Sequence, residues 1–282
     1  MQIAVASGKG GTGKTTVATS FALSMTALSK VRFIDCDVEA PNGHLFLHPH
    51  FTEKTQAVIQ IPHILSDKCV SCGRCVEVCQ FHALALVGNN ILVFPQLCHG
   101  CGSCTWNCPE KAIVEIPNPI GVLEKGMTEE SIEFFRGQLT ISEPMPTPVI
   151  RQLKKLLQPS SNTIEIFDAP PGASCSVVET LRGMDFILLV TEPTPFGLHD
   201  LKQIIAIIRE MEIPAGVIIN RAGIGDHEIE SFCSTENLPI FLRIPFDRQI
   251  AEGISAGKTL VEILPNYSTL FQQLIKQIQE DC

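Results

Sequence analysis

The sequence predicts an α/β fold with a mostly parallel sheet covered by helices on both faces, plus a small inserted cysteine-rich module. Two observations predict the sheet: short apolar segments recur along the chain, and stretches with helical periodicity separate them. A third observation predicts the module, because this alternation stops where eight cysteines follow one another at regular spacing. The main domain is therefore expected to be discontinuous in sequence.

Each strand and helix is assigned from its pattern. Strands are expected at 3–6, 31–34, 163–167, 186–190, 216–219 and 240–244, all of them short and apolar. Helices are expected at 14–28, 147–157, 175–183, 199–211, 247–257 and 266–280. The first helix illustrates the basis, because it lacks Gly and Pro and repeats apolar side chains at Val17, Phe21 and Met25.

The inserted module is assigned to residues 57–118, and the main domain to 1–56 and 119–282. The insert is rich in Cys, Gly and Pro, and a short strand pair at 83–87 and 91–94 is expected around the turn 88–90. A module of about 60 residues buries little apolar core, so we expect bound metal to hold it together.

Composition excludes several classes of function. The chain has 282 residues, 45% of them hydrophobic and 18% charged, and a formal charge of −9. Nucleic acid is not an expected partner, because proteins that bind it present basic patches. Residues 1–7 lead directly into a glycine-rich loop instead of forming a secretory signal, so a cytoplasmic location is expected. The longest apolar run, near Ile187–Val190, is far shorter than the roughly 18 residues of a membrane span, so no stable membrane insertion is expected.

A phosphate-binding loop lies between the first strand and the first helix. Its residues fit the pattern G-x4-G-K-T, in which backbone N–H groups and the helix N-terminus bind phosphate. Lys14 is expected to contact the β- and γ-phosphates of ATP, and the Thr15 hydroxyl to bind Mg²⁺. The residues assigned to the nucleotide here are Gly8, Lys9, Gly10, Gly11, Thr12, Gly13, Lys14, Thr15 and Thr16.

This loop resembles that of the MinD/ParA/Mrp superfamily of P-loop ATPases, in which it is K-G-G-x-G-K-[ST]. Lys9 to Thr15 agree with every fixed position. In that family the early lysine contacts the phosphates of a partner subunit, so the resemblance implies a catalytic role for Lys9. It also implies a dimer in the ATP state, formed with a second copy or with a paralogue. A solvated loop lysine is the alternative.

The resemblance implies further site residues at the ends of strands. Asp37 agrees with the family's water-positioning aspartate, and Asp168, in Asp-Ala-Pro-Pro-Gly, with the carboxylate of the Mg²⁺ shell. With Lys9 and Lys14 these carboxylates form the expected catalytic set for slow ATP hydrolysis. Asp at a strand end is also a common cap or turn former. The expected base-binding residues are Asn220, Arg221, Pro245, Phe246 and Asp247.

The eight regularly spaced cysteines predict two [4Fe–4S] clusters. Each run has the spacing C-x2-C-x2-C-x3-C of bacterial two-cluster ferredoxins, in which the fourth cysteine binds the other cluster. Cluster 1 is then assigned to Cys69, Cys72, Cys75 and Cys108, and cluster 2 to Cys79, Cys98, Cys101 and Cys104. Zinc is the alternative, although zinc sites use two C-x2-C pairs. Gln80 stands where such ferredoxins often have Pro, which affects the turn and not the ligands.

The remaining cysteines and a histidine group are given structural roles. Cys36, Cys175, Cys233 and Cys282 are expected to be small buried hydrophobes. His44, His48 and His50 share a loop, where solvated side chains are expected in preference to metal ligands. The last helix, with a single Lys276, lacks the basic face of a membrane-surface helix and is expected to dock on the sheet.

The whole chain thus resembles MinD-superfamily ATPases with an inserted two-cluster, bacterial-type ferredoxin domain. The first hypothesis is an ATP-binding and ATP-hydrolysing dimeric switch that gates electron transfer from the clusters to a partner protein. The second is an ATPase that assembles or carries iron–sulfur clusters or another metallocofactor. However, residues 222–225 lack the C-x2-C pair that the Mrp carriers place there. The third is a redox-sensing regulatory switch.

Overall fold

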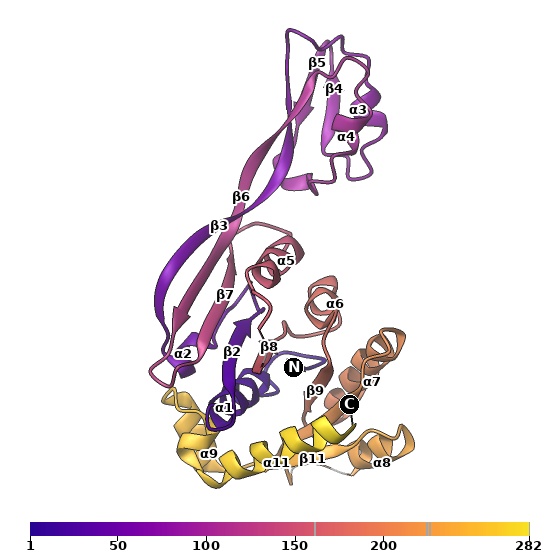
Figure 1. Ribbon diagram of the computed structural model, residues 1–282. Helices are drawn as coiled ribbons and strands as arrows, with labels where there is room; N and C mark the ends of the chain where they lie inside the picture. The colour runs from indigo at the N-terminus through magenta and orange to yellow at the C-terminus, as the bar shows by residue number, and fades with distance from the viewer. Residues whose placement is uncertain (161, 224, 226, 282) are drawn as a thin grey trace. The chain divides into compact units, whose positions relative to one another are not determined.

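The computed structural model describes residues 1–160, 162–223, 225 and 227–281 (Figure 1). The strands are β1 Gln2–Ala6, β2 Lys30–Asp35, β3 His50–Ile64, β4 Leu84–Val87, β5 Asn90–Val93, β6 Ile113–Met127, β7 Glu133–Leu139, β8 Thr163–Asp168, β9 Phe186–Thr191, β10 Ala215–Ala222 and β11 Ile240–Pro245. The helices are α1 Lys14–Met25, α2 His44–Leu47, α3 Arg74–Glu77, α4 Ser103–Trp106, α5 Thr147–Lys155, α6 Cys175–Leu181, α7 Pro195–Glu210, α8 Glu228–Thr235, α9 Arg248–Ser255, α10 Leu260–Ile263 and α11 Asn266–Asp281, with a 3₁₀ turn at Pro95–Leu97.

The chain divides into two compact units. Unit 1 contains residues 1–55, 123–138 and 150–282, and unit 2 contains residues 56–122 and 139–149. Unit 2 therefore includes the expected insert and a second segment that the sequence did not assign to it. The strands β3, β6 and β7 and the helix α5 each contain residues of both units, so the chain passes between the units four times.

A largely parallel sheet, with strands of different lengths, is the centre of the α/β fold. In the described residues its strand order is β11-β10-β9-β1-β8-β2-β7-β6-β3. Neighbours from β11 to β7 are parallel, with registers such as Ala4 opposite Phe167 and Asp35 opposite Asp168. Parallel strands direct their carboxyl ends to one edge, where α/β proteins bind ligands. The ends of β1, β2, β8, β9, β10 and β11 therefore meet at one edge.

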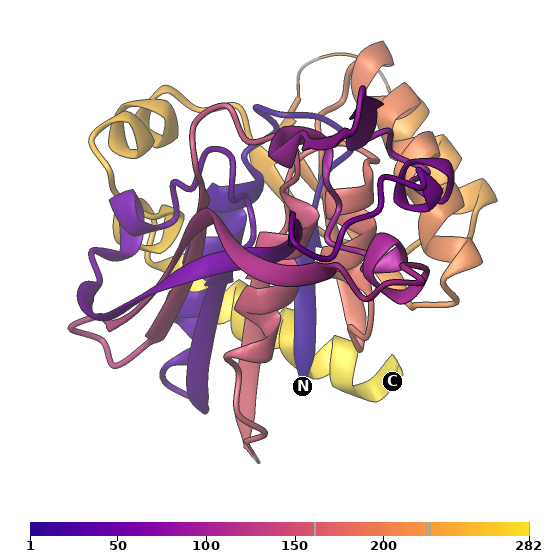
Figure 2. The same cartoon turned by 90° about the horizontal axis from the view of Figure 1, so that it is seen from above.

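The core of unit 1 consists of aliphatic and aromatic side chains between the sheet and its helices. Phe33 stacks on Phe134 with ring centroids 5.3 Å apart, and Phe21 of α1 contacts Phe271 of α11 at 5.8 Å. Figures 1 and 2 both show α11, in yellow, alongside α1. The last helix was expected to dock on the sheet, but its buried face packs mainly on α1, and Leu270 is exposed.

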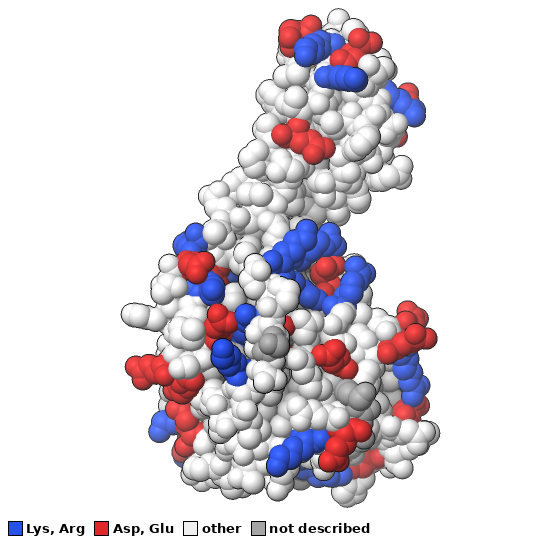
Figure 3. Space-filling view, in the orientation of Figure 1, with Lys and Arg blue, Asp and Glu red and all other residues white. Residues whose placement is uncertain are grey.

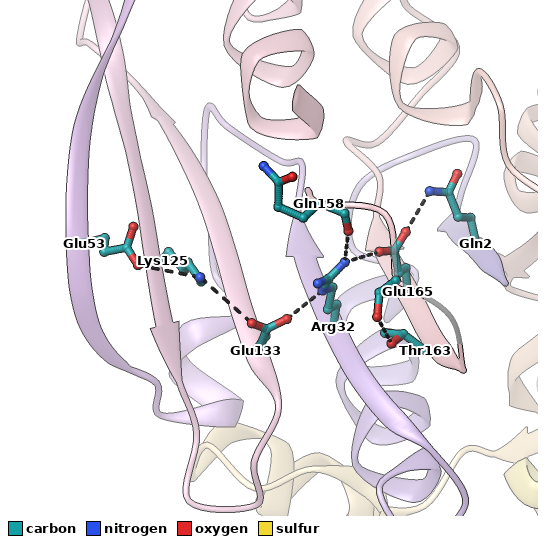
Figure 4. Close-up of polar contacts among 9 residues, drawn as sticks. Gln2, Arg32, Glu53, Lys125, Glu133, Gln158, Thr163 and Glu165 are labelled. Atoms are coloured by element: carbon teal, nitrogen blue, oxygen red, sulfur yellow. Dashed lines mark hydrogen bonds and ion pairs between the residues drawn. The ribbon is translucent and has the colours of Figure 1, made fainter. Parts of the chain in front are cut away.

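A row of polar pairs crosses the strands of unit 1 (Figure 4). The row runs through Glu53, Lys125, Glu133, Arg32, Glu165 and Gln2, with donor–acceptor distances from 2.6 to 3.9 Å. Arg32 is its centre, because it also donates to the Gln158 carbonyl oxygen at 2.6 Å. Such cross-strand pairs contribute about 0.2–1 kcal/mol each, so they favour this strand order without dominating stability.

The surface charges are mixed in sign. On the face in Figure 3, basic and acidic side chains alternate over unit 1. Among the described helices, none is both long enough and apolar enough to cross a bilayer.

Candidate functional sites

The glycine-rich loop joins β1 to α1 at the carboxyl edge of the sheet. Gly11 and Gly13 have φ values of 82° and 87°, which favour glycine. A Cβ on Gly13 would lie 2.3 Å from Asn220 Nδ2, and that amide donates to the Thr12 carbonyl oxygen at 2.7 Å. The loop is therefore held against the end of β10 by a contact that only glycine permits.

Lys14 forms a buried ion pair with Asp168. The side chain of Lys14 is 7% exposed and that of Asp168 is fully buried. Thr15 Oγ1 donates to the other carboxylate oxygen of Asp168 at 2.6 Å. The two residues expected to bind phosphate and Mg²⁺ thus share one carboxylate at the end of β8, and each contacts one of its two oxygens.

Two aspartates end β2 next to this pair. Asp35 is fully buried and accepts hydrogen bonds from the backbone N–H groups of Asp37 at 3.2 Å and Gly43 at 2.9 Å. Burial raises the pKa of Asp35 to about 7, and the Asp168 carboxylate adds to the rise. Burial also raises the pKa of Asp37. Asp35, which was not among the expected site residues, fixes the loop that carries Asp37.

Glu192 is a site residue that the sequence reasoning missed. It follows β9 directly, is buried, and lies 2.6 Å from Arg221 and 3.7 Å from Lys9. Glu192 therefore forms ion pairs with two basic side chains, Lys9 and Arg221, that were both expected to contact the nucleotide. The signal was available, because Glu192 stands at the carboxyl end of a strand next to β1.

A pocket of about 450 Å³ lies above these strand ends. Most residues assigned to the nucleotide line it: Lys9, Gly10, Gly11, Gly13, Lys14, Thr15, Thr16, Asp37, Asn220, Arg221, Pro245, Phe246 and Asp247. Gly8, Thr12 and Asp168 do not line it, since the first two lie on the β9–α7 side of the loop and Asp168 lies beneath Lys14. The lining residues that were not expected include Asn42, Phe46, Ile250 and Ile254.

The polar and apolar lining residues divide this pocket into two regions. Phe46, Phe246, Ile250 and Ile254 provide apolar surface, whereas the glycine-rich loop provides N–H groups and lysines. Asp247 accepts a hydrogen bond from Gln249 N at 2.6 Å and so caps α9. The pocket can thus accept a ligand with a flat apolar part and an anionic part.

In unit 2 the cysteines surround two separate pockets. Four of them line the first pocket: Cys69, Cys72, Cys75 and Cys108, which we call the first quartet. The others line the second pocket: Cys79, Cys98, Cys101 and Cys104, the second quartet. Both pockets are small, with about 20 Å³ each against about 450 Å³ for the pocket at the phosphate loop. Each quartet takes three cysteines from one run and the fourth from the other.

The two halves of this unit repeat each other at a spacing of 29 residues, as from 69 to 98. Helix α4 repeats α3, and the preceding glycines, Gly73 and Gly102, have φ values of 77° and 72°. The Ala83 N–H donates to Cys79 Sγ and the Ala112 N–H to Cys108 Sγ, both at 3.3 Å. Each quartet therefore receives one equivalent backbone N–H.

The repeat extends to hydrogen bonds that connect the halves. The Leu65 N–H donates to the Ala112 carbonyl oxygen, and the Phe94 N–H to that of Ala83, both at 2.8 Å. Residues 65 and 94 are 29 positions apart, as are residues 83 and 112. The two hydrogen bonds are therefore equivalent in the repeat. Between the pockets the apolar core is small, with Cys75, Leu84, Cys104 and Ile113 as its buried members.

The spacing of the thiols bears on which kind of metal site the quartets suit. Over the described parts of the chain, no three His, Cys, Asp or Glu side chains are close enough together to bind one metal ion. A zinc site needs ligands about 2.3 Å from one centre. A [4Fe–4S] cluster takes one thiolate at each of four iron atoms, and so suits thiols that surround a larger space.

The other cysteines differ from expectation at one position. Cys36 and Cys233 are buried, as predicted, and burial raises the pKa of Cys36 well above its usual range. The prediction of a buried Cys175 was wrong: it is exposed, because it begins α6 directly after the loop that follows β8. Cys282 lies outside the described residues. Of the histidines, His44 begins α2 and is half-buried, whereas His48 and His50 are exposed.

Comparison with known sequences identifies the family. A family model described as the CobQ/CobB/MinD/ParA nucleotide binding domain matches residues 3–261. The uncharacterized protein MJ0579 of Methanocaldococcus jannaschii is 31% identical over 276 residues, which are 95% of this chain and 94% of that protein. The iron–sulfur cluster carrier protein of Aquifex aeolicus is 25% identical over 92% of this chain and 61% of its own length.

Solved structures share the fold at low identity. The septum site-determining protein MinD of Pyrococcus horikoshii, in complex with Mg-ADP, superposes with a TM-score of 0.58 at 19% identity, covering 97% of this chain and 95% of that one. A ParA family ATPase of Chlorobium tepidum gives a TM-score of 0.58 at 16% identity, with 99% and 97% covered. Together with the matched family model, the phosphate loop and the sheet order, these findings place the chain: it belongs to the CobQ/CobB/MinD/ParA family of nucleotide-binding domains.

Proposed function

We propose that this protein is a dimeric, ATP-hydrolysing switch that holds two [4Fe–4S] clusters and gates electron transfer from them to a partner protein. One observation carries the proposal. A single chain combines the pocket at the phosphate loop with two further pockets, each lined by four cysteines. Nucleotide binding is a property of the family, whereas the clusters, the gating and the dimer are proposals for this chain.

For the nucleotide, the proposed first event is an exchange of partners at Lys14. Lys14 and Thr15 both contact Asp168. A bound phosphate would compete for the Lys14 ammonium, and the Thr15 hydroxyl and the Asp168 carboxylate would be the groups that hold Mg²⁺. Asp37, which lines the same pocket, is assigned to orient the attacking water.

The proposed dimer uses Lys9. This side chain is 32% exposed and lies 3.7 Å from Glu192, so it is only loosely held within its own subunit. At 3.7 Å this contact is longer than a hydrogen bond, so the ion pair holds Lys9 weakly. Lys9 can therefore leave Glu192 for the phosphates of a second copy at small cost, and Glu192 keeps Arg221 as its partner.

For the clusters, the first and second quartets supply the eight thiolates. When bound, the clusters accept and release single electrons. The residues present fit them, because each quartet has four thiols around one pocket and one backbone N–H directed at a ligand sulfur. Three positive-φ residue pairs, including Gly73 and Gly102, shape both binding loops alike.

A route for coupling runs through α5, which contains residues of both units. In unit 1, Arg151 of α5 donates to both carboxylate oxygens of Glu179 on α6, at 2.9 and 3.2 Å. Lys154 caps α6 by donating to the carbonyl oxygens of Glu179, Thr180 and Arg182 at 2.7–3.0 Å. Since α6 follows the loop after Asp168, a change at that carboxylate has a packed path to α5.

A second candidate function is the assembly or delivery of iron–sulfur clusters. It is favoured by relatives that carry this name, such as the Aquifex aeolicus carrier at 25% identity. Against it, the end of β10 bears Asn220, Arg221 and Ala222 and no cysteine in its described residues.

Anaerobic reconstitution tests the proposal and separates the candidates. Analysis of iron and sulfide should give two [4Fe–4S] clusters per chain, and their potentials, followed by EPR, should shift on addition of MgATP. Lys14→Ala is the matched control, since it should keep both clusters and lose the shift. Potentials that ignore MgATP, together with rapid transfer of cluster to an apo-acceptor, would favour the carrier instead.

A further inference from the structure

The internal repeat of unit 2 allows the two quartets to be compared position by position. Their ligands, short helices and N–H donors to sulfur are equivalent. Any difference between two bound clusters must therefore come from the side chains that break the repeat. Glu115 and Leu86 are such a pair, because they occupy the same position in the two halves, 29 residues apart.

Glu115 places a carboxylate against the binding loop of the second quartet. A Cβ on Gly102, which adjoins Cys101, would lie 2.9 Å from Glu115 Oε1. In the other half, the atom nearest to a Cβ on Gly73 is Leu86 Cδ2, at 3.7 Å. The same backbone position therefore has a negative charge beside it in one half and an apolar side chain in the other.

The remaining charges do not offset this difference. The first pocket is lined by Arg74 and Glu110, which have opposite signs. Among the described lining residues of the second pocket, Glu115 is the sole Asp, Glu, Lys or Arg.

We propose that Glu115 makes the two clusters unequal by lowering the reduction potential of the one at the second quartet. This inference rests on the proposed function. Reduction adds one electron and no proton to a cluster, and a neighbouring carboxylate opposes the added negative charge. The first quartet then holds the cluster of higher potential. A low-potential one-electron donor, such as dithionite, then reduces the cluster at the first quartet before the cluster at the second quartet.

The test is an EPR-monitored redox titration of the reconstituted full-length chain. Glu115→Gln should raise the lower of the two potentials and leave the higher one unchanged. Because Glu115 is exposed to solvent, we expect at most about a tenfold change in the electron distribution, or about 59 mV for one electron. Leu86→Glu, at a side chain that is 42% exposed, should instead lower the higher potential.

Controls keep the outcomes distinct. Glu143→Gln removes a carboxylate from the same unit, outside both pockets, and should shift neither potential. If the wild type has one common potential, or if Glu115→Gln moves neither potential or the higher one, the inference is overturned while the clusters remain. If iron and sulfide do not bind at all, the proposed function itself fails.

Discussion

Replacing Lys14 by Met separates two roles of one buried ion pair. The substitution keeps the length and the apolar stem of the side chain but removes the ammonium that contacts Asp168. Asp168 is then left fully buried, with the Thr15 hydroxyl as its remaining side-chain donor at 2.6 Å. The variant should therefore lose ATP binding and also lose stability before any nucleotide is added.

The magnitude follows from the burial of the pair. Removing one partner of a buried ion pair costs about 3–5 kcal/mol, since the other charge remains desolvated. The surviving Thr15 hydrogen bond places the cost near the lower end, about 3 kcal/mol. At roughly 2–4 °C per kcal/mol, the transition of unit 1 should fall by about 6–12 °C.

The matched control is Lys14→Met combined with Asp168→Asn. This double variant removes the uncompensated charge, so it should regain most of the lost stability without regaining ATP binding. Calorimetry of nucleotide-free protein and an equilibrium ATP-binding assay measure the two effects. A Lys14→Met variant as stable as the wild type would refute the view that Lys14 neutralises Asp168 in the resting state.

Further predictions concern the loop, the pH dependence, the dimer and the clusters. Gly13→Ala should abolish ATP binding, because its Cβ would clash with Asn220 Nδ2 at a φ of 87°; an unchanged affinity would contradict this. The pKa of Asp35 rises from 3.8 to about 7 on folding, so the folded state binds more protons between these values. Stability should then fall as the pH rises from about 4 to 7, and Asp35→Asn should flatten this slope in pH-dependent denaturation. Lys9→Ala should retain ATP binding but lose nucleotide-dependent dimerisation and turnover, as sedimentation and phosphate release can measure. Removing iron anaerobically should unfold unit 2, because its apolar core is small. Well-dispersed NMR signals from unit 2 in iron-free protein would contradict a fold that depends on the clusters.

The strands of the parallel sheet could be predicted because they are buried on both faces. Segment 186–190 is a continuous apolar run and 163–167 is apolar apart from Thr163 and Glu165, and β9 and β8 contain them within one residue at each end. The long strands β3 and β6 were not predicted, because their sequences are partly polar and contain Pro62, Pro117 and Pro119. Their regularity comes from pairing, which the local sequence does not encode.

In the candidate sites too, residues that belong to a local motif could be predicted, whereas residues whose role depends on distant neighbours could not. Motif spacing singled out Lys14 and the eight cysteines, and the family resemblance singled out Asp37; these residues line pockets in the structure, and their roles stay predictions. Glu192 and Asp35 were missed because their roles depend on neighbours distant in sequence, such as Arg221 for Glu192. The exposure of Cys175 was missed for a similar reason, since a lone cysteine carries no signal of its surroundings.

The central claim, that nucleotide state and cluster chemistry are coupled, is tested most directly by one measurement. The potentials of both clusters are determined by EPR in anaerobically reconstituted protein, without nucleotide and with MgATP. We predict that MgATP shifts at least one potential in the wild type and neither in Lys14→Ala. Potentials that are the same with and without MgATP, in a protein that binds ATP and holds both clusters, would contradict the account.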